Sequence, residues 1–307
     1  MRGIDLFCGL GGLSLAMKQA GITPILGVDL WDDAVSVYKK NFPRADVSQG
    51  DLGAKPFRDA LVAEWKGRAD LVVGGVPCQS FSSRNIRTRT GSKLPFHFVD
   101  VTTKLDPEYI LMEEVPGLAS MMHSPKKTYA NALVDAFKRK GYTAEYRVLN
   151  AADHGVAQSR RRLFMIARRG KHTDVFPDVK KSPRIPVSRV ISPPFDPITE
   201  YAAEVLRTNT DKKMGYKIID LDKPSPTVST HYNVPGAWAA VPLGGGEFGT
   251  LGTRNALRVQ GFPASWKLTG RRNTDRVLIG NAVPPPMAKR VLSELFFSKK
   301  INTKHEG

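Results

Sequence analysis

The sequence predicts an α/β fold, because short apolar runs repeatedly end in glycine or an acidic residue and are then followed by segments with helical periodicity. The run 4–7 is followed by a glycine-rich stretch at 8–12 and by apolar residues at 13, 16, 17 and 20. The runs 25–28, 70–73 and 109–112 end in the same manner. Alternating strands and helices are typical of a mostly parallel sheet, in which ligands bind at the carboxyl ends of the strands.

The charge of the chain indicates a polyanionic partner. Its 307 residues include 46 basic and 29 acidic ones, a net charge of +17, which most simply indicates nucleic acid. An anionic membrane surface is the competing interpretation, but no apolar run approaches ~20 residues and no basic amphipathic helix dominates. The first residues lack the apolar core of a signal peptide, and the two cysteines have no paired spacing. We therefore expect a reducing compartment, no disulfide and no metal.

The stretch 5–12 predicts a strand, a glycine turn and a helix that ends at Gly21. Glycines let the main chain approach a ligand closely, and the helix N-terminus offers unpaired N–H groups. Asp29 ends the next strand 20 residues after Gly9, an offset at which a carboxylate commonly binds ribose hydroxyls. The alternative role for Asp29 is an N-cap. Asp51 ends a third unit and either accepts from an adenine amino group or serves as a turn residue.

The stretch Gly74 to Ser82 holds one of the two cysteines directly after a predicted buried strand. Pro77 fixes φ and has no N–H, so it presents Cys78 on a stiff turn at the sheet edge. That placement suits a nucleophile, whose anion must be stabilised because a thiol with a pKa of about 8.5 is only a few per cent ionised at neutral pH. The alternative for an isolated Pro-Cys is a small buried hydrophobe.

Cations follow this cysteine. Arg84, Arg87, Arg89 and Lys93 lie in a stretch without an acidic residue. A charge run is usually a solvated face, but one that begins six residues after a candidate nucleophile is better explained as a loop that binds phosphates over the site.

Two further charged groups adjoin later strands. Glu113 and Glu114 end the strand 109–112, so a pair of carboxylates reaches the same sheet edge as Cys78; alternatively they form an N-cap or a solvated turn. Arg160 and Arg162 adjoin the strand 163–167, and we expect them to share a face because side chains alternate along a strand.

Residues 170–250 differ in composition from the rest of the chain, with ten of the 22 prolines, the triplet Gly244-Gly245-Gly246 and no sustained periodicity. Because this segment is rich in Ile, Val, Tyr and Phe, we expect a small irregular domain that contacts substrate, and not a disordered linker. A helix with apolar residues at 287, 291, 292 and 295 closes the chain.

Six motifs in this order resemble those of the cytosine-5 DNA methyltransferases, over nearly the whole chain except about 170–250. They are the glycine motif Asp5 to Gly12, the Pro-Cys-Gln loop Gly74 to Ser82, Glu113-Glu114-Val115 for Glu-Asn-Val, Gln158, Arg160 and Arg162 for Gln-x-Arg-x-Arg, Arg258 to Pro263 for Arg-x-Gln-Gly-Phe-Pro, and Gly280 to Pro284 for Gly-Asn-x-Val. The resemblance favours a nucleophile at Cys78 over a buried hydrophobe.

The resemblance implies an S-adenosylmethionine-dependent methyltransferase (Rossmann-like) fold, a seven-stranded mostly parallel sheet with helices on both faces, plus a small irregular target-recognition domain. We place the catalytic domain at 1–169 and 251–307, with its terminal helix folded back against the first strand, and the target-recognition domain at 170–250. The implied cofactor is S-adenosylmethionine, released as S-adenosylhomocysteine, with no metal. The residues implied to line its pocket are Phe7, Leu10, Gly12, Asp29, Leu30, Asp51, Leu52, Pro77, Leu94, Asn281 and Val283.

By the same resemblance, Cys78 adds to carbon-6 of a cytosine that has been flipped out of the double helix, which makes carbon-5 nucleophilic. Glu113 supplies or shares a proton at ring N3 and contacts the exocyclic amine. Arg162 holds the 2-carbonyl, and Arg160 supports the thiolate and the closed loop. We assign the DNA contacts to Gln79, Ser82, Arg84, Arg87 and Arg89.

Two positions depart from the family pattern. Glu114 stands where Asn is usual, and Asn255 stands where Glu is common. We hypothesise that Glu114 raises the pKa of Glu113 and so favours its proton-donating form.

Two other functions fit parts of the sequence. The tRNA cytosine methyltransferases share the scaffold and would suit a cationic chain, but they carry a Cys-Phe-Thr triplet in the recognition region, and here no cysteine follows Cys78. A catalytically silent nucleic-acid-binding homologue is opposed by the intact Cys78, Glu113 and Arg162.

Size and family together lead us to expect a monomeric prokaryotic modification enzyme with double-stranded DNA as its partner. We expect it in the cytoplasm, associated with the nucleoid when on DNA, and paired with a separately encoded restriction endonuclease. The DNA sequence that it recognises stays open.

Overall fold

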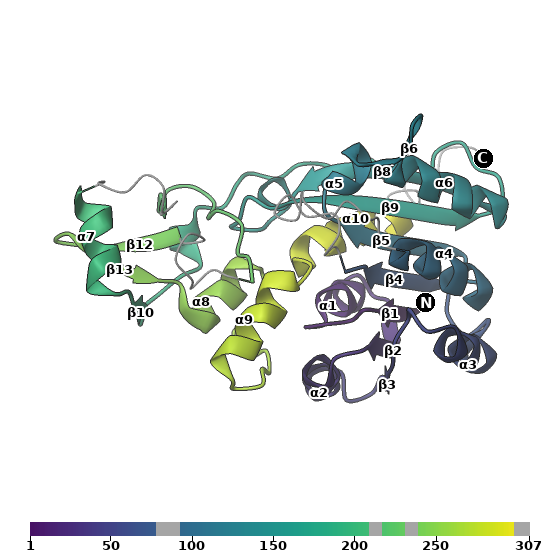
Figure 1. Cartoon of the computed structure of the whole chain (residues 1–307), viewed down its shortest axis with the longest axis horizontal. Coiled ribbons are helices and arrows are strands. Elements are labelled where there is room, and N and C mark those ends of the chain that lie inside the picture. Colours follow the sequence, from purple (N-terminus) through teal and green to yellow (C-terminus); the bar gives the residue numbers. More distant parts are fainter. Residues whose placement is uncertain (78–92, 209–216, 231–238, 298–307) are drawn as a thin grey trace, which may run out of the picture. The chain divides into compact units, whose positions relative to one another are not determined.

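The computed structural model describes residues 1–77, 93–208, 217–230 and 239–297 (Figure 1). The chain forms two compact units. The first consists of Met1–Leu149, Arg161–Lys180 and Ala288–Gly307, and the second of Asn150–Arg160 and Lys181–Met287. The boundaries at 170 and 250 that the sequence suggested for a target-recognition domain remain a prediction.

The first unit is built on a seven-stranded sheet with the order β3-β2-β1-β4-β5-β9-β8. These strands are β1 (Arg2–Leu6), β2 (Thr23–Asp29), β3 (Asp46–Gln49), β4 (Leu71–Gly75), β5 (Tyr109–Glu114), β8 (Tyr142–Asn150) and β9 (Arg161–Arg169). Neighbouring strands from β3 to β5 pair in parallel, whereas β9 pairs antiparallel with β5. The expected seven-stranded, mostly parallel sheet is confirmed.

Helices cover both faces of this sheet (Figure 1). They are α1 (Gly12–Gln19), α2 (Asp32–Asn41), α3 (Lys55–Trp65), α4 (Leu94–Leu105), α5 (Gly117–Ser120), α6 (Tyr129–Arg139) and α10 (Pro285–Phe297). Ile4 and other apolar side chains on one face form a single core cluster with α3, α4 and α6. On the opposite face, a Cβ at Gly3 would meet Met17 of α1, and a Cβ at Gly27 would meet the ring of Tyr38 of α2.

The parallel strands bring the motif loops to one edge of the sheet. Because β1 to β5 run in the same direction, the residues that follow Leu6, Asp29, Gln49, Gly75 and Glu114 all lie at its carboxyl edge. The sequence motifs at 5–12 and 113–115 and the described residues 74–77 of the third motif therefore converge there.

The second unit has its own small sheet, with the order β10-β13-β12-β11. Its elements are β10 (Asp196–Pro197), α7 (Glu200–Thr208), β11 (Lys217–Ile218), β12 (Ala239–Gly244), β13 (Glu247–Thr250), α8 (Gly252–Val259) and α9 (Arg272–Asn281), with short 3-10 turns at Ala151–Asp153 and Val187–Arg189. Strands of two to six residues leave little hydrophobic periodicity, which explains why the sequence showed none.

Two local features differ from or extend the expectations. The pair Ser124-Pro125 has the sequence pattern of a helix start and predicts a helix from Ser124 that ends at Gly141. Instead, β6 (Met122–Ser124) and β7 (Lys127–Thr128) form a hairpin. Helix α6 begins at Tyr129, and its N-cap is Thr128, whose hydroxyl accepts the N–H of Asn131. In the terminal helix α10, the ring of Phe296 packs edge-on against Tyr109 of β5, with centroids 4.9 Å apart. Packing of this helix against β1 remains a prediction.

Candidate functional site

The turn between β1 and α1 passes three times through the left-handed region of main-chain conformation, which favours glycine. Phe7, Gly9 and Gly11 have φ angles of 59°, 49° and 85°. The turn is anchored to the neighbouring strand, because the N–H of Cys8 donates to the carbonyl of Val28 (2.9 Å). The turn therefore delivers the N-terminus of α1, which begins at Gly12, to the carboxyl edge of the sheet.

The carboxylate of Asp29 joins this turn to the end of β2. One oxygen accepts the N–H of Gly9 (2.9 Å) and the other accepts the N–H of Trp31 (3.0 Å). Burial raises the pKa of Asp29, an effect that these hydrogen bonds partly oppose. Asp29 is not the N-cap of α2, since that position is held by Trp31.

Beneath the turn lies a buried polar cluster that the sequence reasoning missed. The carboxyl group of Asp5 is fully buried and accepts both the N–H (3.0 Å) and the hydroxyl (2.7 Å) of Ser14, whose Oγ also lies 2.7 Å from the Tyr38 hydroxyl. Burial raises the pKa of Asp5 to about 7. The cluster ties the end of β1 to α1 and α2, and so supports the turn above it.

The other implied cofactor residues of the first unit follow the strands at the same edge. Leu30 is 62% exposed after β2, Asp51 is exposed after β3, and Pro77 is exposed after β4. The remaining positions of this unit range from half-buried to buried: Phe7 and Leu94 are half-buried, and Leu10, Gly12 and Leu52 are buried. In the second unit, Asn281 is the exposed last residue of α9 and Val283 is buried.

An acid pair stands at the end of β5, as expected. Glu113 and Glu114 are 6% and 1% exposed. They lie opposite Phe164 and Leu163 of β9, which places Arg162 next along that strand. Arg162 Nε lies 2.9 Å from Glu113 Oε1, an ion pair in which both side chains are largely buried. The N–H of Val76 donates to the carbonyl of Glu113 (3.3 Å), so the chain two residues before Cys78 lies beside this acid.

Among the described residues, Glu114 forms no ion pair like the one between Glu113 and Arg162, although the charge of Arg162 acts on its carboxyl group as well. One carboxyl oxygen accepts the N–H of Val115 (2.6 Å), and Oε1 is buried without a hydrogen-bond partner among the described residues. Burial raises the pKa of Glu114 to about 8. The hypothesis that Glu114 raises the pKa of Glu113 remains a prediction.

Arg160 and Arg162 do not share a strand face, contrary to expectation. Arg160 lies before the first residue of β9 and belongs to the second unit, so strand alternation does not apply to it. Its guanidinium is buried and donates to the carbonyls of Val228 and Gly280, at 2.9 Å each. The side chain thus joins two distant segments of the second unit.

Two more motif residues of the second unit are bonded into the same network. The amide of Gln158 donates to Gln260 (2.9 Å) and accepts the N–H of Val228 (2.8 Å), and Gln260 donates to the carbonyl of Ile279 (2.6 Å). The motifs at 158–160, 258–263 and 280–284 therefore assemble one buried polar framework.

Asn255, the second departure from the family pattern, has a clear structural reason. Its side-chain oxygen accepts the N–H of Ser192 (3.1 Å), and its side-chain nitrogen donates to the carbonyl of Ser192 (2.9 Å). A carboxylate could accept but not donate, so only an amide satisfies both groups.

Cys78 and the predicted DNA contacts Gln79, Ser82, Arg84, Arg87 and Arg89 lie outside the described residues. Within the described part of the chain, no group of three or more His, Cys, Asp or Glu side chains could hold a metal ion. None of the helices in that part is long and apolar enough to cross a membrane.

Comparison with known proteins supports the motif assignment. The model of the family "C-5 cytosine-specific DNA methylase" matches residues 1–234 and 246–296. The chain is 30% identical over 298 residues to the type II methyltransferase M.HgiDI of Herpetosiphon aurantiacus, covering 94% of this chain and 92% of that relative. It is 38% identical over 184 residues to the type II methyltransferase M.XorII of Xanthomonas oryzae, a match that spans 57% of this chain and 42% of that relative.

The fold also resembles solved structures. The S. pombe Dnmt2 methyltransferase superimposes with a TM-score of 0.76 at 18% identity, covering 98% of this chain and 99% of that one. At this identity the likeness concerns the fold alone.

Proposed function

The chain belongs to the C-5 cytosine-specific DNA methylase family, and we propose that it transfers a methyl group from S-adenosylmethionine to carbon-5 of a cytosine within one specific sequence of double-stranded DNA. The observation that carries this proposal is the convergence at one sheet edge of the glycine turn, the chain leading to Cys78, and the buried pair of Glu113 and Arg162. A cofactor site and a cytosine site must adjoin for methyl transfer.

The residues of the first unit fit an S-adenosyl group. Asp29 accepts one main-chain N–H on each oxygen and keeps lone pairs that ribose hydroxyls can use. The exposed side chain of Leu30 offers an apolar surface for a base, and Asp51 offers a carboxylate for an amino group. When bound, this group supplies an electrophilic methyl on a sulfonium.

The ion pair of Glu113 and Arg162 fits recognition of a cytosine edge. We propose that Glu113 shares a proton with ring N3 and accepts from the exocyclic amine, while Arg162 turns its remaining donors to the 2-carbonyl. Their mutual ion pair of 2.9 Å holds both groups before the base arrives, which limits the reorganisation needed during reaction.

Cys78 is proposed as the nucleophile on the strength of its motif. Its thiolate forms a bond to carbon-6, which pushes electron density to carbon-5; carbon-5 then takes the methyl group. Loss of the carbon-5 proton returns an electron pair to the ring and expels the thiolate. Neither carbon is accessible in a stacked duplex, so the base is flipped out at a cost of a few kcal/mol. Arg160 enters this scheme as a residue that holds the second unit together; direct support of the thiolate stays a prediction.

Further parts of the proposal concern context. The curated relatives are type II methyltransferases, which supports pairing with a separately encoded restriction endonuclease. We propose a monomer that acts in the cytoplasm of a prokaryote, bound to the nucleoid when on DNA, with the segment 170–250 reading the target sequence.

Bisulfite sequencing of DNA from an expressing host tests the proposal. We expect protection of cytosine at one position of one short sequence, lost in cells that express Cys78→Ser. Protected cytosines in tRNA alone would instead favour the RNA enzymes, and no protection in either nucleic acid would favour a silent homologue.

A further inference from the structure

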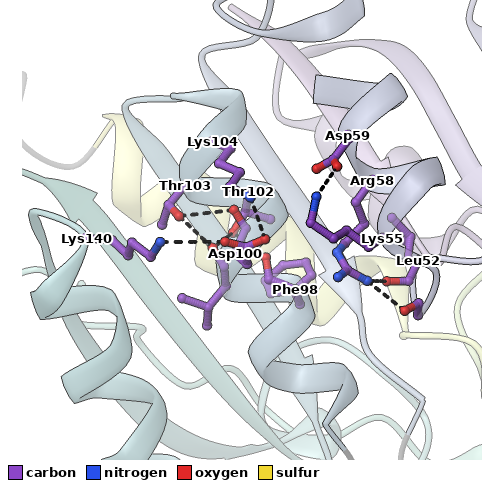
Figure 2. Close-up of polar contacts among 12 residues, drawn as sticks. Leu52, Lys55, Arg58, Asp59, Phe98, Asp100, Thr102, Thr103, Lys104 and Lys140 are labelled. Carbon is purple, nitrogen blue, oxygen red and sulfur yellow. Dashed lines mark hydrogen bonds and ion pairs between the residues drawn. The ribbon is translucent and has the colours of Figure 1, made fainter. Parts of the chain in front are cut away.

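Arg58 is a buried cation that binds the turn following β3. It lies on α3 and is 8% exposed. Its Nη1 donates to the carbonyl oxygens of Leu52 and Gly53, both at 2.8 Å (Figure 2). Both hydrogens of this nitrogen are therefore used on two consecutive peptide groups. No carboxylate pairs with Arg58 among the residues the structure describes.

The turn that Arg58 holds also fixes the direction of the Asp51 carboxylate. The N–H of Gly53 donates to Asp51 Oδ1 (2.7 Å), so the peptide groups bound by Arg58 adjoin the donor that orients Asp51. A Cβ at Gly53 would lie 2.9 Å from the same oxygen, which shows how closely the turn wraps the carboxylate. The Leu52 side chain is 2% exposed and anchors the turn from below.

Burying a guanidinium is costly, and a simpler residue would serve if only helix packing were needed. Lys55, one turn earlier on α3, shows the ordinary alternative: it is exposed and pairs with Asp59 on its own helix (Figure 2). Arg58 instead donates hydrogen bonds to main-chain carbonyls. Its Nε is buried without a hydrogen-bond partner among the described residues. This arrangement holds one particular loop conformation.

We propose that Arg58 is a positioning residue for the cofactor, which holds Asp51 in the direction that accepts the amino group of the adenine. The proposal rests on the proposed function, because it requires that Asp51 face an S-adenosyl group. Arg58 itself touches neither the cofactor nor the DNA; it acts through the two peptide groups after Asp51.

The test measures binding of S-adenosylhomocysteine to the full chain by calorimetry, for the wild type, Arg58→Met, Arg58→Lys and the control Lys55→Met. We expect Arg58→Met to weaken binding about tenfold, and Arg58→Lys, which retains donors, to recover part of the loss. Lys55→Met removes a cation from the same helix without touching the turn, and should bind as the wild type does. DNA affinity and the rate at saturating S-adenosylmethionine should stay within about twofold in all variants.

A second ligand separates positioning from a general loss of structure. S-inosylhomocysteine carries an oxo group in place of the adenine amino group, so the wild type should bind it much more weakly than S-adenosylhomocysteine. In Arg58→Met that preference should shrink about tenfold, because Asp51 is no longer held toward the amino group. Equal weakening of both ligands would overturn the proposal, as would unchanged binding of S-adenosylhomocysteine. If the wild type bound neither ligand, the proposed function itself would fail.

Discussion

Glu114 offers the sharpest test of the electrostatics at the end of β5. We consider Glu114→Gln, which keeps the shape and the acceptor for the N–H of Val115 but removes the titrating group. Burial raises the pKa of this carboxyl from 4.5 to about 8. In the folded protein it therefore keeps its proton up to about pH 8, whereas in the unfolded chain it loses the proton near pH 4.5.

The sign follows from the protons bound in each state. Between these two values the unfolded state binds fewer protons than the folded state, so the stability of the wild type falls as pH rises and then levels off above about pH 8. One pKa unit corresponds to about 1.4 kcal/mol, so the contribution lost between pH 5 and pH 7 is about 3 kcal/mol. Glu114→Gln has no titrating group here and lacks this loss. The difference in unfolding free energy between Glu114→Gln and the wild type should therefore grow, in favour of the variant, by about 3 kcal/mol from pH 5 to pH 7.

The assay is urea unfolding of both proteins at several pH values from 5 to 9, with Glu108→Gln as the matched control. Glu108 directly precedes β5 but its side chain is 52% exposed, so its replacement should leave the pH dependence unchanged. Parallel stability curves for wild type and Glu114→Gln would refute the reasoning.

Three further substitutions test the polar framework of the second unit. Asn255→Glu restores the residue common in the family but cannot donate to the carbonyl of Ser192, so thermal denaturation should show a loss of about 1–3 kcal/mol. Gly280→Ala places a methyl group 2.4 Å from the main-chain nitrogen of Thr230 and should cost about 1–3 kcal/mol in the same assay. Arg160→Met leaves two buried carbonyls without their donor and should destabilise the chain by about 3 kcal/mol or more, with Arg160→Lys recovering part of it.

Each of these has a clear contrary result. An Asn255→Glu protein as stable as the wild type would mean that the contact with Ser192 does not select the amide. A neutral Gly280→Ala would mean that the facing chain can move aside. Full stability of Arg160→Met, with loss of methyl transfer alone, would favour a direct role of Arg160 in the chemistry.

The parts of the fold that depend on local pattern were predictable. Strands such as β4 and β5 are short apolar runs that stop at glycine or acid, and α6 carries its buried residues at helical spacing. The hairpin at 122–128 was missed because Ser124-Pro125 looks like a helix start, while the cap was supplied by Thr128. Where two start signals compete within five residues, tertiary contacts decide.

The residues that act through distant main-chain groups were not predictable. Nothing in the sequence around Arg58 shows that its guanidinium reaches the turn at 52–53, and an arginine on an amphipathic helix is usually solvated. The expectation that Arg160 shares a strand face with Arg162 was wrong, because Arg160 lies just before β9 and alternation of side chains applies only within a strand. The state of Glu114 also depends on burial, which neighbouring residues in the sequence do not reveal.

The central claim is a transient bond between Cys78 and a cytosine in DNA. The most direct measurement is covalent trapping on a duplex that contains 5-fluorocytosine at the target position, where the carbon-5 substituent cannot leave and the adduct persists. We expect a complex that survives denaturation, requires S-adenosylmethionine and disappears in Cys78→Ser. A complex that forms equally well in Cys78→Ser, or only on RNA, would contradict the account.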